Sequence, residues 1–204
     1  MPNSQVFPDI QISLPQWLQA FPFRHDRIYP HLQERMRLVI ELSRLNVKHQ
    51  TGGPFAAAVF DANTHQLIAP GVNLVVPSHA SLAHAEMVAI TIAQQHRQHF
   101  YLGTNAQQSF ELVSSTEPCA MCMAALAWSG IQQLICGARD ADARAIGFDE
   151  GHKVQPWQDS LRQQGIGVKC DICRDEAVAV LQYYARKNGL IYNGRSEPFQ
   201  GSNC

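Results

Sequence analysis

The segment FELVSSTEPCAMC, residues 110–122, joins an apolar run to a pair of cysteines. Residues 110–114 predict a short buried strand, and Pro118 is typical of the first turn of a helix, which we expect to run from Cys119 through Trp128. Cys119 and Cys122 then share one face of the first helical turn, where unpaired backbone N–H groups and the helix dipole stabilise thiolates. The segment therefore predicts a strand that leads into a helix carrying two metal-ligating sulfurs.

A histidine and a carboxylate lie upstream of this segment. His84, Ala85 and Glu86 open a second predicted helix, residues 84–96. His84 would complete a three-ligand site with the two cysteines, and a tetrahedral zinc ion with three protein ligands keeps its fourth position for water, as in catalytic sites. Glu86 is then placed to handle the protons of that water. A CxxC or HxE pair alone is a weak signal, but their order and spacing together with Pro118 make a specific one.

Length and composition point to one domain acting on a small substrate. The chain has 204 residues, of which 46% are hydrophobic, enough for one sizeable core. Its 16 Lys and Arg balance 17 Asp and Glu without a basic run, which favours a small molecule over nucleic acid. Residues 1–15 lack the pattern of a signal peptide, and no apolar run has membrane-spanning length, so we expect a cytoplasmic protein that does not bind membranes.

The remaining cysteines leave one alternative open. Six cysteines without a secretion signal fit a reducing compartment better than a disulfide framework. Cys136 lies in an apolar run and is predicted to be a buried core residue. Cys170 and Cys173 form a second CxxC pair, which could join the first in a four-cysteine structural zinc site. That alternative leaves His84 and Glu86 without a role, so we favour the catalytic site.

Predicted strands and helices alternate along the chain, a pattern typical of a sheet sandwiched between helices. Residues 1–30 carry five prolines and little periodicity, and predict an irregular arm. The elements predicted outside the zinc motif are a helix at 31–48, strands at 55–60 and 66–76 around a turn at 61–64, a strand at 133–138, a helix at 157–162, a strand at 166–169 and a helix at 175–186.

The order His-x-Glu then Pro-Cys-x-x-Cys is the signature of zinc-dependent nucleobase deaminases. With it, the stretches 52–55 (GGPF), 71–73 (GVN), 115–119 (STEPC) and 147–151 (GFDEG), together with Trp128, resemble the cytidine deaminase superfamily, and within it most closely bacterial guanine deaminases. The resemblance covers roughly residues 50–192. It implies a three-layer α/β/α sandwich with a central mixed sheet, a homodimer, and conversion of guanine to xanthine and ammonia. The deaminase domain would span 31–188, followed by a tail at 189–204 that is a candidate active-site flap.

The resemblance also implies roles for individual residues. His84, Cys119 and Cys122 would hold zinc, Glu86 would shuttle protons, and Glu150 would be a second catalytic carboxylate that reaches the N–H groups of the purine and assists the departing ammonia. The residues expected to bind the substrate are Phe55 (stacking on the ring), Asn73 (at the carbonyl edge of the base), Ala85, Glu117, Trp128 and Asp149.

Several of these residues also have structural interpretations. Glu150 resembles the many loop carboxylates that are solvated or cap a helix, and Phe55 and Trp128 are residue types more often found in cores than as ligand platforms. Asn73 could be a turn residue near the end of a strand. These alternatives stay open from the sequence.

Three other functions are compatible with the zinc motif. A tRNA adenosine deaminase would need a surface for phosphates, and a cytosine-type nucleoside or nucleotide deaminase would leave residues 147–151 without a role. A non-catalytic zinc-stabilised interaction module would not need Glu86. A related amino-heterocycle such as ammeline could also be a substrate.

Overall fold

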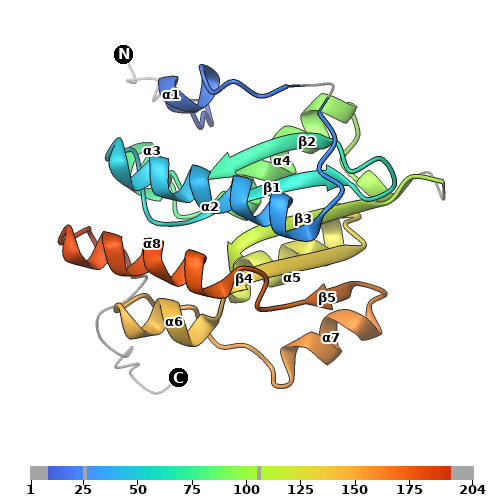
Figure 1. The fold of residues 1–204 in the computed structure, drawn as a ribbon. Coiled ribbons are helices and arrows are strands. Elements are labelled where there is room, and N and C mark those ends of the chain that lie inside the picture. The colour runs from blue at the N-terminus through green and yellow to red at the C-terminus, as the bar shows by residue number, and fades with distance from the viewer. Residues whose placement is uncertain (1–8, 25–26, 105–106, 194–204) are drawn as a thin grey trace, which may run out of the picture.

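The computed structural model describes residues 9–24, 27–104 and 107–193, which fold around a five-stranded sheet of order β2-β1-β3-β4-β5 (Figure 1). β1 pairs antiparallel with β2 and β3, whereas β3 with β4 and β4 with β5 are parallel. The predicted mixed sheet is therefore confirmed. The strands are β1 (Ala56–Asp61), β2 (Leu67–Val72), β3 (Phe110–Thr116), β4 (Gln133–Ala138) and β5 (Gly167–Lys169).

Helices cover both faces of the sheet, which makes the predicted three layers. α2 and α8 pack on one face, and α4 and α5 lie behind the sheet on the other (Figure 1). The helices are α1 (Gln16–Gln19), α2 (Leu32–Lys48), α3 (Val75–Ser78), α4 (Ala85–Arg97), α5 (Ala120–Ser129), α6 (Asp140–Ala145), α7 (Trp157–Gln163) and α8 (Arg174–Arg186), with a 3-10 turn η1 (Leu102–Thr104).

The strand residues divide between two hydrophobic cores. Ala56, Ala58 and Phe60 of β1 belong to the core beneath α2, and Ala57 and Val59 to the core beneath α4. Successive strand side chains point to opposite faces, so a sheet covered on both sides needs nearly continuous apolar strands. Coverage of both faces buries every residue of β1 and β3, including the polar residues of β3.

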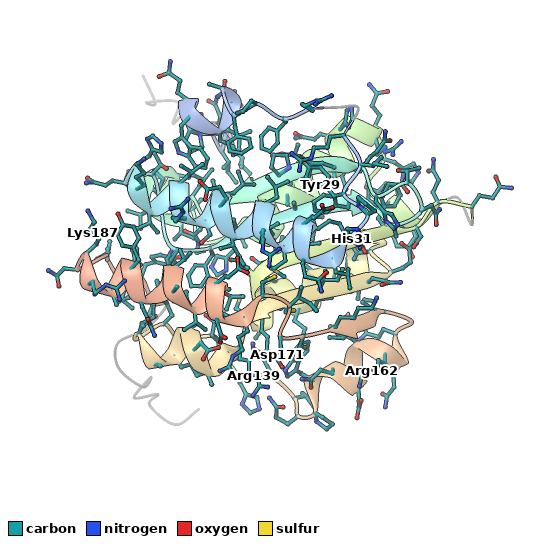
Figure 2. All side chains as sticks on the ribbon, in the orientation of Figure 1. Tyr29, His31, Arg139, Arg162, Asp171 and Lys187 are labelled. Atoms are coloured by element: carbon teal, nitrogen blue, oxygen red, sulfur yellow. The ribbon has the colours of Figure 1, made fainter. Side chains whose placement is uncertain are left out.

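The arm is attached to the body by aromatic contacts. Trp17, Phe21 and Phe23 pack against the core beneath α2. Tyr29, which is labelled in Figure 2, is buried and meets the ring of Phe60 edge-on, with ring centroids 5.7 Å apart. These aromatic residues therefore hold the arm against the body of the molecule.

The predicted elements differ from the observed ones mainly where segments are short. The strand expected at 66–76 ends at Val72, because the chain turns there into α3. Four short elements were not predicted, because none of them is long enough to show helical periodicity: α1, α3, α6 and η1. The division at residues 30 and 188 stays a prediction. Within the described ranges, no helix combines the length and apolarity needed to cross a membrane.

A buried ion pair joins α2 to β3. Arg35 Nε lies 2.6 Å from Glu111 Oε1, and both side chains are only 4% exposed. Arg35 also donates a hydrogen bond to the carbonyl of Tyr29. We expect Arg35→Met to lower the free energy of unfolding by about 3–5 kcal/mol, because Glu111 would stay buried without its partner. Urea unfolding followed by circular dichroism measures the change.

The matched control for this prediction is Arg37→Met on the same helix. Arg37 pairs with Glu176 at 3.0 Å, but the two side chains are 58% and 47% exposed. Water and salt screen such a pair, so we expect this substitution to change stability far less. Equal losses in the two variants would argue against a special cost of isolating Glu111.

Candidate active site

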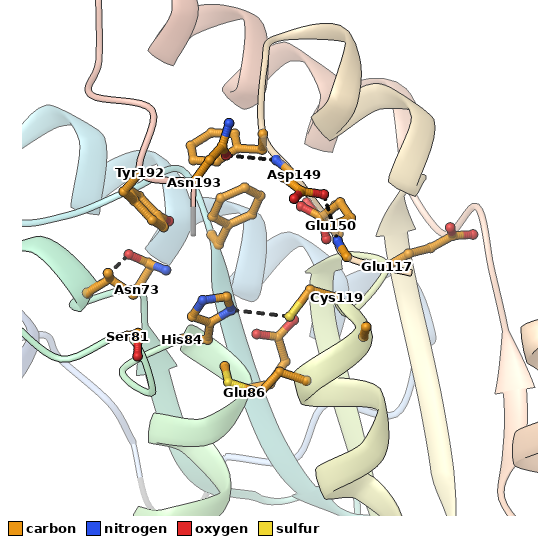
Figure 3. A pocket seen from close by; sticks show the side chains of 17 residues that line it. Asn73, Ser81, His84, Glu86, Glu117, Cys119, Asp149, Glu150, Tyr192 and Asn193 are labelled. Atoms are coloured by element: carbon orange, nitrogen blue, oxygen red, sulfur yellow. Dashed lines mark hydrogen bonds between the residues drawn. The ribbon is translucent and has the colours of Figure 1, made fainter. Parts of the chain in front are cut away.

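The two predicted ligand segments meet where α4 and α5 begin. His84 and Cys119 are the residues immediately before these helices, and both have extended backbone, with ψ of 155° and 169°. Cys122 lies in the first turn of α5. His84 Nδ1 is 3.4 Å from Cys119 Sγ (Figure 3). The same nitrogen is 3.6 Å from Cys122 Sγ. The prediction that the three side chains converge at two helix starts is confirmed, although two of them precede the helices.

The three donor atoms fit a zinc ion. They all lie within 4.8 Å of one another. Zinc bonds of about 2.3 Å to sulfur and about 2.0–2.1 Å to nitrogen, at tetrahedral angles, place the two ligand atoms about 3.6 Å apart. The hydrogen bond from the Cys122 thiol, and further that from His84, lower the pKa of Cys119 to about 4 against the effect of burial. Cys119 is therefore a thiolate, the form that binds metal.

Nothing supports the four-cysteine alternative. Within residues 9–24, 27–104 and 107–193, one group of three or more His, Cys, Asp or Glu side chains is close enough to hold a metal ion. It consists of His84, Cys119 and Cys122. Cys136 is fully buried in the core beneath α4, as predicted, and Cys170 packs against that core. The zinc site therefore involves the first CxxC pair and the histidine.

Glu86 lies in the first turn of α4, directly beside the ligand cluster. Its Oε1 accepts a hydrogen bond from Ser114 Oγ at 3.0 Å, and its Oε2 accepts one from Cys122 Sγ at 3.5 Å. Burial raises the pKa of Glu86 above its usual range, and the charge of Cys119 raises it further. Ser114 thus fixes one carboxylate oxygen, while the other faces the cluster, where it can hold a proton.

Glu150 approaches the same cluster from the loop of residues 147–151, which follows α6. The loop is bracketed by Gly147 and Gly151, whose φ angles of +105° and +69° favour glycine. The Glu150 carbonyl accepts a hydrogen bond from Ala120 N at 3.0 Å, which ties the loop to the start of α5. Glu150 is buried, which excludes a solvated carboxylate, and burial together with the Cys119 charge raises its pKa to about 8.

A cavity of about 560 Å³ brings these groups together (Figure 3). Every predicted metal or catalytic residue except the buried Cys122 lines it. Among the predicted substrate-binding residues it is lined by Phe55, Asn73, Glu117 and Asp149. Residues that line it without having been predicted are Val75, Ser81, Thr116, Ala120, Met121, Phe148, Gly151, Tyr192 and Asn193.

Two of the predicted substrate-binding residues lie outside this cavity. Ala85 is fully buried in the core beneath α4. Trp128 is 82% exposed. It follows Cys119 by nine residues, which is about 14 Å along a helix, so it lies at the far end of α5. Neither residue lines the cavity, and their contact with a substrate stays a prediction.

Two of the predicted carboxylates in the cavity wall are already engaged by the protein. Glu117 Oε2 accepts a hydrogen bond from the backbone N–H of Asp140 at 2.9 Å, at the start of α6. Asp149 is exposed, and its Oδ1 accepts a hydrogen bond from Gly151 N at 2.9 Å. These contacts give both side chains a role in holding loops around the cavity.

The end of the described chain forms another wall. The ring of Tyr192 lies 5.1 Å from that of Phe148, with the planes inclined at 64°. Asn193 Oδ1 accepts a hydrogen bond from Asp149 N at 2.8 Å, and its Nδ2 donates to Gly147 O at 3.0 Å. Residues 190–193 thus lie against the loop of Glu150. The rest of the predicted flap, 194–204, is outside the described residues.

The sequence contains little that would predict Phe148 and Tyr192 in the cavity wall. Phe148 belongs to the stretch GFDEG at 147–151, in which only the two carboxylates were predicted to have a role. Tyr192 lies near the start of the predicted flap. Their place in the wall depends on tertiary contacts between residues 148 and 192, which no local pattern encodes.

Comparison with known proteins agrees with this geometry. Residues 30–138 match the family model described as the cytidine and deoxycytidylate deaminase zinc-binding region. A guanine deaminase of Bacillus subtilis (strain 168) is 32% identical over 115 residues, which are 56% of this chain and 69% of that protein.

Two solved structures are similar over nearly their whole length. A guanine deaminase from Nitrosomonas europaea is 40% identical, with a TM-score of 0.82 over 89% of this chain and 99% of that one. The protein NE0047 in complex with 2,6-diaminopurine is 42% identical, with a TM-score of 0.83 over 91% and 97%. The family match, the shared fold and the three zinc-binding side chains lead to one conclusion: this chain belongs to the cytidine and deoxycytidylate deaminase family of zinc-dependent hydrolases.

Proposed function

We propose that this protein is a guanine deaminase, which converts guanine and water to xanthine and ammonia. The observation that carries the proposal is the presence of two buried carboxyl groups, Glu86 and Glu150, in one cavity with the zinc-binding side chains of His84 and Cys119. Similar proteins named guanine deaminase support the same substrate.

His84, Cys119 and Cys122 would hold the zinc ion, which when bound makes water a strong nucleophile near neutral pH. Glu86 takes a proton from the attacking water and passes it to the ring nitrogen beside C2. A carbon–oxygen bond forms at C2 and the bond to the amino group breaks. Glu150, whose pKa of about 8 leaves it mostly protonated at neutral pH, donates the proton with which ammonia departs. The hydroxyl at C2 loses its proton as the carbonyl of xanthine forms, and this proton restores Glu150.

The walls of the cavity supply contacts for the base. The rings of Phe55 and Phe148 meet edge-on, with centroids 4.9 Å apart, and offer an apolar surface on which a purine can lie. Asn73 is buried and contributes an amide to the rim, where it would face the carbonyl edge of guanine. Such a mix of apolar walls and a few polar groups is typical of small-molecule sites.

Ammonia release from a panel of substrates tests the proposal. The purified, zinc-quantified protein is assayed with guanine, guanosine, adenine, cytosine, cytidine, ammeline and a tRNA anticodon stem-loop, and Glu86→Ala serves as the blank. We expect guanine to be the preferred substrate. Turnover only of the RNA or of a pyrimidine would overturn the substrate assignment, and a zinc-loaded protein without turnover would favour an interaction module.

We also propose that the protein acts as a homodimer in the reducing cytoplasm, where its free cysteines would persist. α5 contains no charged residue, and its outer side exposes Ala124, Ala127 and the large ring of Trp128. A solvent-facing apolar helix of this kind is typical of a self-complementary interface.

The Trp128→Lys substitution is expected to shift the protein from dimer to monomer, because it would place a charge in the centre of the apolar surface. Light scattering coupled to size-exclusion chromatography measures the mass. Val154→Lys is the matched control, since Val154 is also exposed, at 68%, but belongs to the loop between α6 and α7 and not to α5. A wild-type protein that is monomeric at micromolar concentration would contradict the proposed dimer.

A further inference from the structure

A buried amide joins the two strands that end at the cavity. Asn46, near the end of α2, is fully buried, and its Nδ2 donates hydrogen bonds to Gly53 O and to Asn73 O, both at 2.9 Å. Gly53 lies just before β1, and Asn73 lies just after β2. One side chain therefore bridges the segments that lead into and out of this hairpin.

Both bridged segments lead directly to residues of the cavity wall. Asn73 itself lines the cavity, and its backbone N–H donates to the carbonyl of Phe55 at 3.0 Å. Phe55 lines the cavity two residues after Gly53. The Asn46 amide thus fixes the backbone from which the proposed carbonyl-edge contact and the proposed stacking ring both project.

Asn46 is itself held from the other side. Its Oδ1 accepts a hydrogen bond from Thr51 Oγ1 at 2.7 Å, and Thr51 Oγ1 accepts one from Trp17 Nε1 at 2.8 Å. The Trp17 ring stacks on His49 at 5.5 Å. The side-chain amide of Asn46 therefore has both its N–H groups and its oxygen engaged, and the network extends into the arm.

The fit around the amide leaves no spare room. A Cβ atom placed on Gly52 would lie 1.8 Å from Asn73 O and 2.8 Å from Asn46 Nδ2. Residue 52 must therefore lack a side chain if Asn46 is to reach both carbonyls. The glycine and the amide together set the distance between the segments.

We propose that Asn46, backed by Thr51, is a positioning residue for recognition of the base, an inference that rests on the proposed function. It touches neither substrate nor zinc. It sets the places of Asn73 and Phe55, whereas His84, Glu86 and the cysteines are carried by α4 and α5. Its loss should weaken base binding more than the chemical step.

Asn46→Asp tests the bridge at nearly constant volume. A carboxylate oxygen would replace Nδ2, so the two buried carbonyls would lose their donor. We expect the KM for guanine to rise about tenfold, with kcat and zinc content close to those of the wild type. A smaller folded fraction would instead lower the apparent kcat and leave KM unchanged.

The pair Thr51→Val and Thr51→Ser keeps the test decisive if Asn46→Asp does not fold. Thr51→Val removes the hydroxyl that holds the amide, and we expect KM to rise about threefold, whereas Thr51→Ser keeps the hydroxyl and should stay near the wild-type value. Wild-type KM values in Asn46→Asp and Thr51→Val would overturn the inference, as would a decrease confined to kcat.

A control for general destabilisation lies at the other end of the same hairpin. Asp61 Oδ1 accepts hydrogen bonds from Asn63 N and Thr64 N, both at 2.9 Å, in the turn after β1. We expect Asp61→Ala to lower the melting temperature without changing KM. Guanine turnover by the wild-type protein tests the proposed function separately, and an inactive wild type would overturn both proposals.

Discussion

The Glu86→Gln variant is expected to retain zinc but to deaminate guanine about 10²–10⁴-fold more slowly than the wild type, the usual contribution of a general acid or base. Glutamine matches glutamate in shape, and its amide oxygen can still accept the hydrogen bond that Ser114 Oγ makes to Glu86 at 3.0 Å. The side chain would keep its place beside the ligand cluster but could no longer carry a proton from water to the ring. The loss should fall on kcat.

The measurement combines steady-state kinetics with metal analysis of the same preparation. One zinc ion per chain together with the slow turnover would support the role of Glu86. Normal turnover would contradict it. Ser114→Ala is an informative partner, because it leaves the carboxyl group in place but removes the hydrogen bond that orients it, so we expect a smaller loss than in Glu86→Gln.

The second large effect is expected from Cys119→Ser, which replaces the thiolate donor by a hydroxyl that does not ionise near neutral pH. The remaining His84 and Cys122 supply too few donors for a stable zinc site. We expect the zinc content to fall well below one ion per chain and guanine turnover to be lost at least as completely as in Glu86→Gln. Inductively coupled plasma mass spectrometry and the ammonia assay measure the two losses.

Cys170→Ser is the matched control, because it removes a cysteine of the second CxxC pair by the same change. Cys170 is not part of the ligand cluster, so we expect zinc content and activity to stay at wild-type values. Loss of zinc from this variant would support the four-cysteine structural zinc site instead. Chelation of the wild-type protein should likewise abolish turnover, and added zinc should restore it; unfolding on chelation would instead favour the interaction module.

Local sequence patterns predicted the long elements and the metal ligands well. The strand at 133–138 has the predicted bounds, and the helices expected to begin at His84 and Cys119 start one residue later. The reason is physical: apolar periodicity reflects burial against the sheet, and the ligand spacing reflects geometry within one helical turn. Both are properties of neighbouring residues.

The walls of the cavity could not be predicted in the same way. Tyr192 and Phe148 are distant in sequence and meet only through packing, and Asn46 looks like any polar residue near the end of a helix. Trp128 was expected at the substrate because of the resemblance, but its position nine residues along α5 carries it away from the cavity. Long-range contacts, which composition does not encode, decide these placements.

The metal ligands come from the starts of two helices, whereas connecting segments supply much of the cavity wall, through Phe55, Asn73, Ser81 and residues 148–151 and 192–193. The zinc-binding side chains are therefore held by packed helices, whereas much of the remaining cavity wall, Glu150 included, lies in loops, which tolerate sequence change better than packed elements. Exchanging Phe148 together with residues 192–193, with Glu150 kept, should alter which heterocycle is accepted while zinc stays in place. For enzyme engineering, this makes the chain a scaffold in which selectivity can be redesigned around a fixed zinc site and a retained Glu150.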